Sequence, residues 1–295
     1  MAVRVVADST SYVPDEQVSD LGITVVQLSA TLAGVTRAEK DIDSDAFYRL
    51  MLSSGEFPTS SQPSVASITE AFEGAVSAGD DVVAVVLSSL MSGTFDTARM
   101  VREQVLARFP DSRIEVLDSR SNSMQEGFAV LAAARAAHEG GDADAVLAAA
   151  RSAMSRSRWL FVPASLDYLR MGGRIGNAAA LLGTLLRVRP ILTVEEGLTS
   201  TVRTVRTQGR AVRAITEMVA ADAREHGLAA AVVHHILAPA MGEELAAEIE
   251  KLTGLRPRLQ LLGPVIGLHV GPGSVGVVYL TERPLPGRAP LVAPS

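Results

Sequence analysis

The chain has 295 residues, 27 Lys and Arg against 33 Asp and Glu, a formal net charge of -6 and no cysteine. The absence of cysteine excludes disulfides, zinc thiolate sites, iron–sulfur clusters and cysteine nucleophiles. The acidic balance argues against nucleic acid as a main partner. No apolar run is long enough to cross a bilayer, and the first ten residues, MAVRVVADST, lack the apolar core of a signal peptide. We therefore expect a cytoplasmic protein, and its length favours two domains.

The first half of the chain alternates short apolar runs with amphipathic or alanine-rich segments. The apolar runs are rich in β-branched residues, which is typical of strands buried on both faces. They occur at Val3–Ala7, Ile23–Leu28, Thr31–Thr36, Val82–Leu87 and Ile114–Leu117. The alternation predicts an α/β domain over residues 1–157, with a mostly parallel, Rossmann-like sheet.

The second half, residues 158–282, is predicted to form a mixed α/β sheet, because Pro190–Val194 and Leu198–Arg206 read as a hairpin. A helix is expected from Ser165 to a left-handed cap at Gly172, and another over Ala178–Leu186. The segment Gly263–Gly273 is rich in glycine and proline and is predicted to be a loop. The tail, residues 283–295, contains four prolines and is predicted to be disordered.

Small polar residues follow three predicted strands of the first half. They are Asp8-Ser9-Thr10, Ser88-Ser89 and Asp118-Ser119. The carboxyl ends of parallel strands share one edge, so these residues predict a polar cleft there.

Ser92-Gly93-Thr94 comes directly before a predicted helix. Hydroxyls and unpaired N–H groups at such a position suit an anion. The alternative, that Ser92 or Thr94 only caps the helix, stays open.

Two further residues are candidates for binding an anion. His269 lies among glycines, where its imidazole could donate to a carboxylate, or it could be an ordinary surface histidine. Arg174 follows two glycines, and a guanidinium binds carboxylate or phosphate bidentately. The segment Phe57–Ser64, in which two prolines bracket four small polar residues, is by its pattern alone an exposed loop that ends in a helix cap at Ser64 or Ser67.

Other motifs carry no function. Gly271-x-Gly273-x-x-Gly276 has dinucleotide-binding spacing but precedes a strand instead of opening a helix. There is no Gly-Lys-Ser/Thr phosphate loop, no Gly-x-Ser-x-Gly elbow, and no recognised metal spacing around His234 and His235. We predict no cofactor and no metal.

Taken together, these stretches resemble the DegV family of bacterial fatty-acid-binding proteins, of the fatty-acid-kinase B type. The matching segments occur in the family's order at Asp8–Thr10, Thr59–Ser64, Ser88–Thr94, Asp118–Ser119, Leu166–Ile175 and Ile266–Gly273. Three positions depart from the family pattern. Ser60 stands where many relatives have Thr, Met91 replaces a usual Leu, and Leu268 stands where a smaller residue is common.

The resemblance implies two α/β domains with a long-chain fatty acid in a tunnel at their junction. Ser60, Ser92 and His269 would bind the carboxylate, with Ser61, Thr94 and Arg174 as further candidates. Arg206, which by its pattern alone could equally belong to a solvated charged face, would face a partner. A buried carboxylate needs such donors, and each buried CH₂ contributes about 0.8 kcal/mol.

The family's role is not catalytic. The protein would present the carboxylate to a separate ATP-dependent fatty acid kinase, and the acyl phosphate would feed phospholipid synthesis. We expect a monomer that makes at most transient contact with a membrane.

Two alternatives remain. One is a serine hydrolase with Ser92 as nucleophile and His269 as base, oriented by Asp8 or Asp118. The other is a carrier of another apolar acid, such as an isoprenoid or a hydroxy acid.

Overall fold

The computed structural model describes residues 2–182 and 188–286 of the chain. A parallel sheet occupies the first half, with strand order β2-β1-β6-β7. Its strands are β1 (Val3–Asp8), β2 (Thr24–Val26), β6 (Asp81–Val86) and β7 (Ile114–Asp118). The prediction of a parallel α/β arrangement in this half is confirmed.

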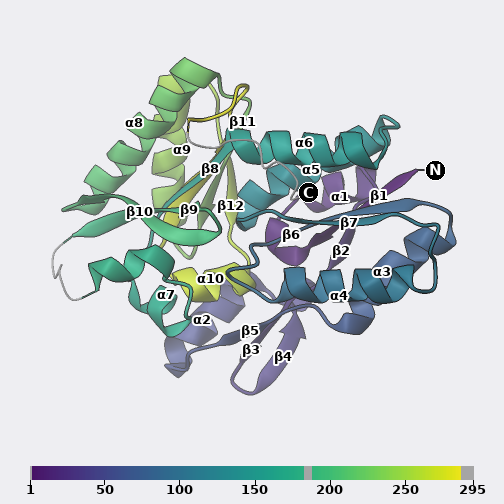
Figure 1. Ribbon diagram of the computed structural model, residues 1–295. Helices are drawn as coiled ribbons and strands as arrows, with labels where there is room; N and C mark the ends of the chain where they lie inside the picture. The colour runs from purple at the N-terminus through teal and green to yellow at the C-terminus, as the bar shows by residue number, and fades with distance from the viewer. Residues whose placement is uncertain (1, 183–187, 287–295) are drawn as a thin grey trace.

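Helices cover both faces of the parallel sheet (Figure 1). They are α3 (Val65–Ser77) and α4 (Thr94–Leu106) on one face, and α5 (Ser123–His138) and α6 (Ala143–Arg156) on the other. In β6, Val82 and Ala84 pack toward α3 and α4, whereas Val83 and Val85 pack toward α5. This two-sided burial explains why β6 is apolar without interruption.

A six-stranded mixed sheet follows, with order β10-β9-β8-β13-β11-β12. Its strands are β8 (Ser157–Val162), β9 (Arg189–Glu195), β10 (Leu198–Val205), β11 (Ala230–His235), β12 (Arg258–Leu261) and β13 (Val275–Leu280). Only the β11–β12 pair is parallel. The predicted hairpin of β9 and β10 is confirmed. The long helices α8 (Gln208–His226) and α9 (Pro239–Thr253) cover the outer face, and the inner face shares a core with α5.

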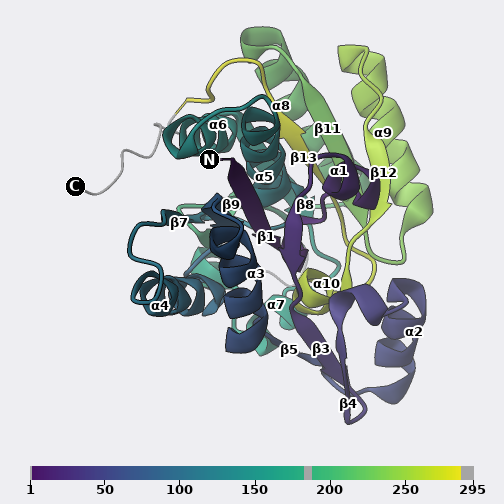
Figure 2. The ribbon, with the colours of Figure 1, turned by 90° about the vertical axis from the view of Figure 1, so that its right-hand side faces the viewer.

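A small antiparallel sheet, ordered β4-β3-β5, extends from the body of the molecule (Figure 2). Its strands are β3 (Ser29–Leu32), β4 (Val35–Ala38) and β5 (Thr59–Ser61), and α2 (Ser44–Ser54) lies beside it. The strand expected over Thr31–Thr36, with a break at Gly34, is in fact two strands, β3 and β4. Ala33 and Gly34 have φ of 51° and 75° and form the turn of a hairpin.

Three local predictions in the second half need correction or restriction. The segment around His269 is not a loop, because Pro264–Val270 forms helix α10. Gly172 is not left-handed: helix α7 (Asp167–Met171) ends with Gly172 at φ −77°, and Gly173 takes φ 70°. In place of the helix expected from Ala178 there is a 3-10 helix, η3 (Gly176–Leu181), and residues 183–187 lie outside the described residues.

The remaining elements are short. They are α1 (Asp15–Asp20), η1 (Ser9–Ser11) and η2 (Glu39–Asp41). Of the predicted disordered tail, residues 287–295 lie outside the described residues, while Leu285 is buried and its N–H donates to the Ser155 carbonyl. The division into domains at residue 157 stays a prediction. Within residues 2–182 and 188–286, none of the helices combines the length and apolar character that a bilayer span requires.

Candidate functional site

A cavity of about 310 Å³ lies between the parallel sheet, the mixed sheet and α10. One part of its lining is polar and includes Ser60, Ser61, Gln62, Ser92, Arg174 and His269, with Asn122 and Thr199 as further polar residues. The other part is apolar and includes Leu28, Leu87, Met91, Trp159, Phe161 and Ile266. A polar end joined to an apolar body suits an amphipathic small molecule, and the volume is at the lower end of the typical range for such sites, about 300–1,000 Å³.

Ser60 and His269 meet at the polar end although they are 209 residues apart. The Ser60 Oγ lies 3.0 Å from the His269 Nε2. Ser60 comes from the edge strand β5 and His269 from α10, which lies between α2 and α7 (Figure 2). Among the described residues, the His269 Nδ1 has no hydrogen-bond partner.

His269 is 8% exposed, and this burial is the main reason why its pKa is lowered to about 3. The nearby positive charge of Arg174 adds to the effect. The imidazole is therefore neutral at physiological pH, with one N–H donor and one acceptor nitrogen. It can donate a hydrogen bond to an anion, but it is a weak base.

Ser92 is placed by the turn that opens α4. Its hydroxyl lies 2.9 Å from the Thr94 hydroxyl, and the Thr94 N–H donates to it at 3.3 Å. Gly93, not Ser92 or Thr94, is the N-cap residue. Ser92 and Gly93 line the cavity, whereas Thr94 is fully buried behind them. Thr94 thus orients Ser92 and does not line the cavity itself.

Arg174 brings a positive charge to the cavity, and none of the residues that the structure describes pairs it with an acid. Its Nε donates to the Met91 carbonyl at 3.0 Å and its Nη1 to the Gly172 carbonyl at 2.7 Å. No carboxylate contributes to the shift of its pKa, which burial alone lowers from the ordinary value. In the described part of the chain, the charge of Arg174 is therefore free to bind an anion in the cavity.

The other predicted site residues lie elsewhere or contribute less. Ser61 lines the cavity from an exposed position on β5. Arg206 is exposed beyond the end of β10 and does not line the cavity. Its role toward a partner stays a prediction.

The expected polar cleft at the strand ends is instead a buried network. The Asp8 carboxylate accepts the Leu87 N–H at 2.8 Å and the Thr10 hydroxyl at 2.6 Å. The Thr10 hydroxyl also lies 3.1 Å from the Glu126 carboxyl. Burial raises the pKa of both acids, and that of Glu126 rises well above its ordinary value. These residues fix the backbone of Leu87, which lines the cavity, and do not line it themselves.

The apolar wall contains residues that the sequence did not single out. Trp159, the only tryptophan of the chain, stacks on Phe161 at 5.0 Å between ring centroids and meets the His234 ring edge-on at 5.6 Å. Gly276 lies beneath the indole, because a β-carbon there would approach Trp159 Cζ3 to 2.6 Å. Asn122 also lines the cavity, with its amide directed at the Met91 sulfur. Alternation along β8 buries these aromatic rings but does not reveal a cavity beside them.

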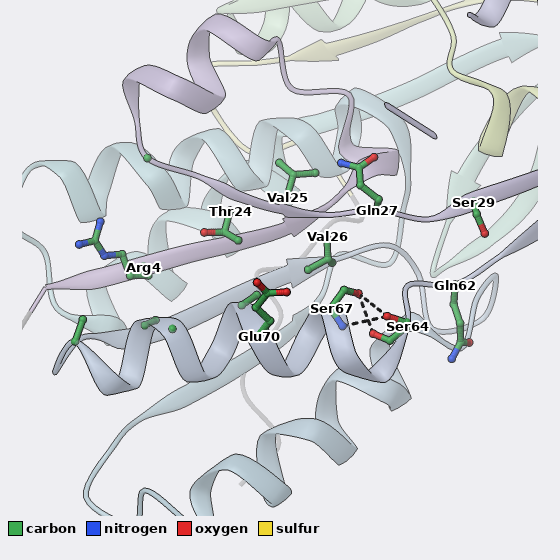
Figure 3. Close-up of a pocket in the computed structure, with 15 residues that line it drawn as sticks. Arg4, Thr24, Val25, Val26, Gln27, Ser29, Gln62, Ser64, Ser67 and Glu70 are labelled. Atoms are coloured by element: carbon green, nitrogen blue, oxygen red, sulfur yellow. Dashed lines mark hydrogen bonds between the residues drawn. The ribbon is translucent and has the colours of Figure 1, made fainter. Parts of the chain in front are cut away.

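A larger groove of about 760 Å³ lies between β2 and α3 (Figure 3). Polar side chains such as Thr24, Gln27, Ser67 and Glu70 line it, and the Arg4 Nε donates to Asp80 at 2.7 Å beside it. This polar surface groove cannot shield an apolar ligand from water, so the smaller cavity is the candidate site. Among the described residues, no group of three His, Asp or Glu side chains could hold a metal ion.

Comparison with known proteins assigns the chain to a family. A model of the DegV family matches residues 2–282. A DegV domain-containing protein of Clostridium acetobutylicum is 44% identical over 283 residues, which are 96% of this chain and 99% of the relative. The chain belongs to the DegV family.

Solved structures of DegV proteins have the same fold. A Thermus thermophilus DegV family protein, described as binding fatty acid, superimposes with a TM-score of 0.86 at 30% identity, covering 95% of this chain and 100% of that one. A stearic acid-binding protein from Eubacterium ventriosum has a TM-score of 0.84 at 26% identity, covering 95% and 98%. The matched residues of the DegV model include every candidate site residue discussed above.

Proposed function

We propose that this protein binds a long-chain fatty acid, with the carboxylate at Ser60, Ser92, Arg174 and His269 and the acyl chain along the apolar wall. The observation that carries the proposal is the Arg174 guanidinium, which lies in the same cavity as two hydroxyls and a neutral imidazole and has no acidic partner among residues 2–182 and 188–286. A carboxylate would satisfy these donors. The acyl chain would leave water at about 0.8 kcal/mol per CH₂.

We further propose that the protein presents this carboxylate to a separate ATP-dependent kinase and is not itself a catalyst. In that reaction a carboxylate oxygen attacks the γ-phosphoryl group of ATP, which yields acyl phosphate and ADP. Arg206, exposed on the β10–α8 connection, is proposed to face the kinase. The acyl phosphate would then feed phospholipid synthesis.

The geometry speaks against the alternative of a serine hydrolase with Ser92 and His269. Ser92 is hydrogen-bonded to Thr94, and the described residues place no acid on His269. Asp8 accepts from Thr10 and Leu87, and Asp118 accepts from Ser89, so neither acid orients the imidazole. A nucleophile without an oriented base is not activated.

Mass spectrometry of the freshly purified protein tests ligand binding. Native spectra are expected to show one bound small molecule, which denaturation releases as a long-chain fatty acid. Release of a different apolar acid would support the carrier of another acid. A ligand-free protein that also fails to take up added palmitate would overturn the proposal.

A second assay tests the kinase step. Palmitate-loaded protein, a fatty acid kinase and ATP are expected to give acyl phosphate, which hydroxylamine traps as a hydroxamate. Arg206→Glu should lower this yield while palmitate affinity is unchanged. Hydroxamate formed at the same rate without the loaded protein would contradict a presenting role.

A further inference from the structure

Helix α10, which carries His269, is bound at its first turn by residues from the beginning of the chain. The Val265 N–H donates to the Glu39 Oε1 at 2.9 Å, and the Ile266 N–H donates to the Tyr12 hydroxyl at 3.2 Å. The N-cap residue of α10, Gly263, has no side chain that could serve these N–H groups. Glu39 and Tyr12 therefore cap a helix from which they are separated by more than 200 residues.

The Glu39 carboxylate is the centre of this cap. It is 7% exposed and accepts three hydrogen bonds, from the Ser9 hydroxyl at 2.6 Å, the Tyr12 hydroxyl at 2.9 Å and the Val265 N–H. Both hydroxyls already accept a backbone N–H, from Leu28 and Ile266 respectively. Every group that faces Glu39 is thus a donor, and an ionised carboxylate satisfies all of them. A protonated carboxyl would leave one donor hydrogen without an acceptor.

Close packing keeps α10 in register with this cap. The Tyr48 hydroxyl lies 2.8 Å from the carbonyl oxygens of both Leu262 and Gly263. A β-carbon on Gly263 would approach the Glu39 Oε1 to 2.6 Å, and one on Gly267 would overlap the Tyr48 hydroxyl. The helix cannot shift along its axis without breaking these contacts. At its other end, His269 meets Ser60 and packs against Gly172.

We propose that Glu39 is a positioning residue of the fatty-acid site: by binding the first turn of α10 it holds His269 against Ser60, and its protonation weakens ligand binding. The inference rests on the proposed function, because it concerns the affinity for a fatty acid. Glu39 does not line the cavity and acts only through α10.

The surroundings of Glu39 place its protonation near neutral pH. Burial, and secondarily the charge of Asp8, raise the pKa of Glu39 to about 7. The pKa values of Tyr12 and Tyr48 are raised well above the ordinary value, and those of His234 and His269 are lowered to about 3, so these neighbours stay neutral. The pKa of Asp8 is also raised, and this group is the competing source of a pH effect.

The test uses the full-length protein and palmitate, with binding followed by the fluorescence of Trp159 in the cavity wall between pH 5.5 and 8.5. Wild-type affinity is expected to fall about fivefold toward low pH, the equivalent of roughly one hydrogen bond. Glu39→Gln should bind about fivefold more weakly than wild type at pH 8.5 and show no change with pH. Glu126→Gln is the matched control: it removes the acid that faces Asp8, leaves α10 untouched and should keep the wild-type profile.

Two outcomes overturn the positioning role: a wild-type affinity that is constant over this range, or a Glu39→Gln profile that is parallel to wild type. Should Glu39→Gln not fold, hydrogen exchange of the Val265 and Ile266 amides in the ligand-free wild type decides. For local openings that release α10 while Glu39 stays buried, the protection of these amides, corrected for the intrinsic rate, should fall as pH drops through 7, because protonation removes the acceptor that binds α10. Constant protection refutes the role. A wild type that binds no palmitate at any pH overturns the proposed function instead, and the exchange measurement still tests the cap.

Discussion

Gly172→Ala is the change that tests the position of His269 most directly. Gly172 has φ −77°, a conformation that alanine adopts freely. A methyl group there would nevertheless overlap the Nδ1 atom of His269 and come within 3.0 Å of its Cε1 and 3.2 Å of its Cγ. The ring must then move away from Ser60. At a backbone conformation that suits alanine, Gly→Ala by itself raises the free energy of unfolding by roughly 0.4–1 kcal/mol, so the protein should stay folded.

The expected loss in the free energy of palmitate binding is that of one hydrogen bond to a charged group, roughly 1.5–3 kcal/mol. This corresponds to a palmitate affinity about ten- to a hundredfold weaker. Titration followed by Trp159 fluorescence measures it, and urea unfolding measures stability in the same samples.

Gly173→Ala is the matched control. Gly173 has φ 70°, and no atom of the described residues lies within 4 Å of a β-carbon built there. This change should destabilise the fold by roughly 1–2 kcal/mol through backbone strain and leave palmitate affinity unchanged. If Gly172→Ala binds palmitate as wild type does, or if both variants lose affinity equally, His269 does not hold the carboxylate.

Three further predictions concern charge and hydroxyl contacts. Arg174→Gln should weaken palmitate much more than palmityl alcohol, since only the acid needs the positive charge; equal losses in paired titrations would contradict an anion site. Ser92→Ala and Thr94→Val should each weaken palmitate by about fivefold, and the double variant no further, because Thr94 acts through the Ser92 hydroxyl; additive losses would refute this dependence. Between pH 4.5 and 7 the native state keeps a proton on Glu39 that the unfolded chain releases, because burial raises the pKa from 4.5 to about 7. As pH rises from 4.5 to 7, the wild-type free energy of unfolding should therefore decrease by about 3 kcal/mol relative to that of Glu39→Gln, as measured by urea unfolding. Parallel curves for the two proteins would exclude the raised pKa.

The sequence predicted the elements whose signal is local. The apolar run Val82–Leu87 corresponds to β6, and the β9–β10 hairpin follows from the turn at Glu196-Gly197. Burial on both faces leaves an uninterrupted β-branched run that any such strand must show. The DegV resemblance was equally readable, because its motifs are short and ordered along the chain.

Helix α10 could not be predicted from its own residues. Pro264 suits the first position of a helix, but Gly263 before it offers no side-chain cap and Gly267 inside it disfavours helix in isolation. The hydrogen-bond acceptors that cap its first turn are Glu39 and Tyr12, which lie 226 and 254 residues earlier. Tertiary contacts thus override local propensity, and His269 stands on a fixed helix instead of a loop.

The cavity itself could not be predicted from the sequence, for a related reason. Trp159 and Phe161 alternate along β8 as any core residues would, and no pattern distinguishes a wall that faces a cavity from one that faces packed side chains. Gly276 shows the same limit, since it lies beneath the indole on the neighbouring strand and reads in sequence only as part of a glycine-rich segment.

The electrostatics of the polar end favour binding over chemistry. A hydroxyl 3.0 Å from an imidazole, as in Ser60 and His269, is also the beginning of a nucleophilic site. Here the pKa of His269 is lowered to about 3, and its Nδ1 has no acidic partner in the described part of the chain. Such an imidazole cannot draw the proton from a serine at neutral pH, but its N–H and the serine O–H can both point at a carboxylate. The positive charge of Arg174 lowers the pKa of His269, and the same charge would attract a carboxylate in the cavity. The same charge thus disfavours hydrolysis at this site and favours retention of an acid.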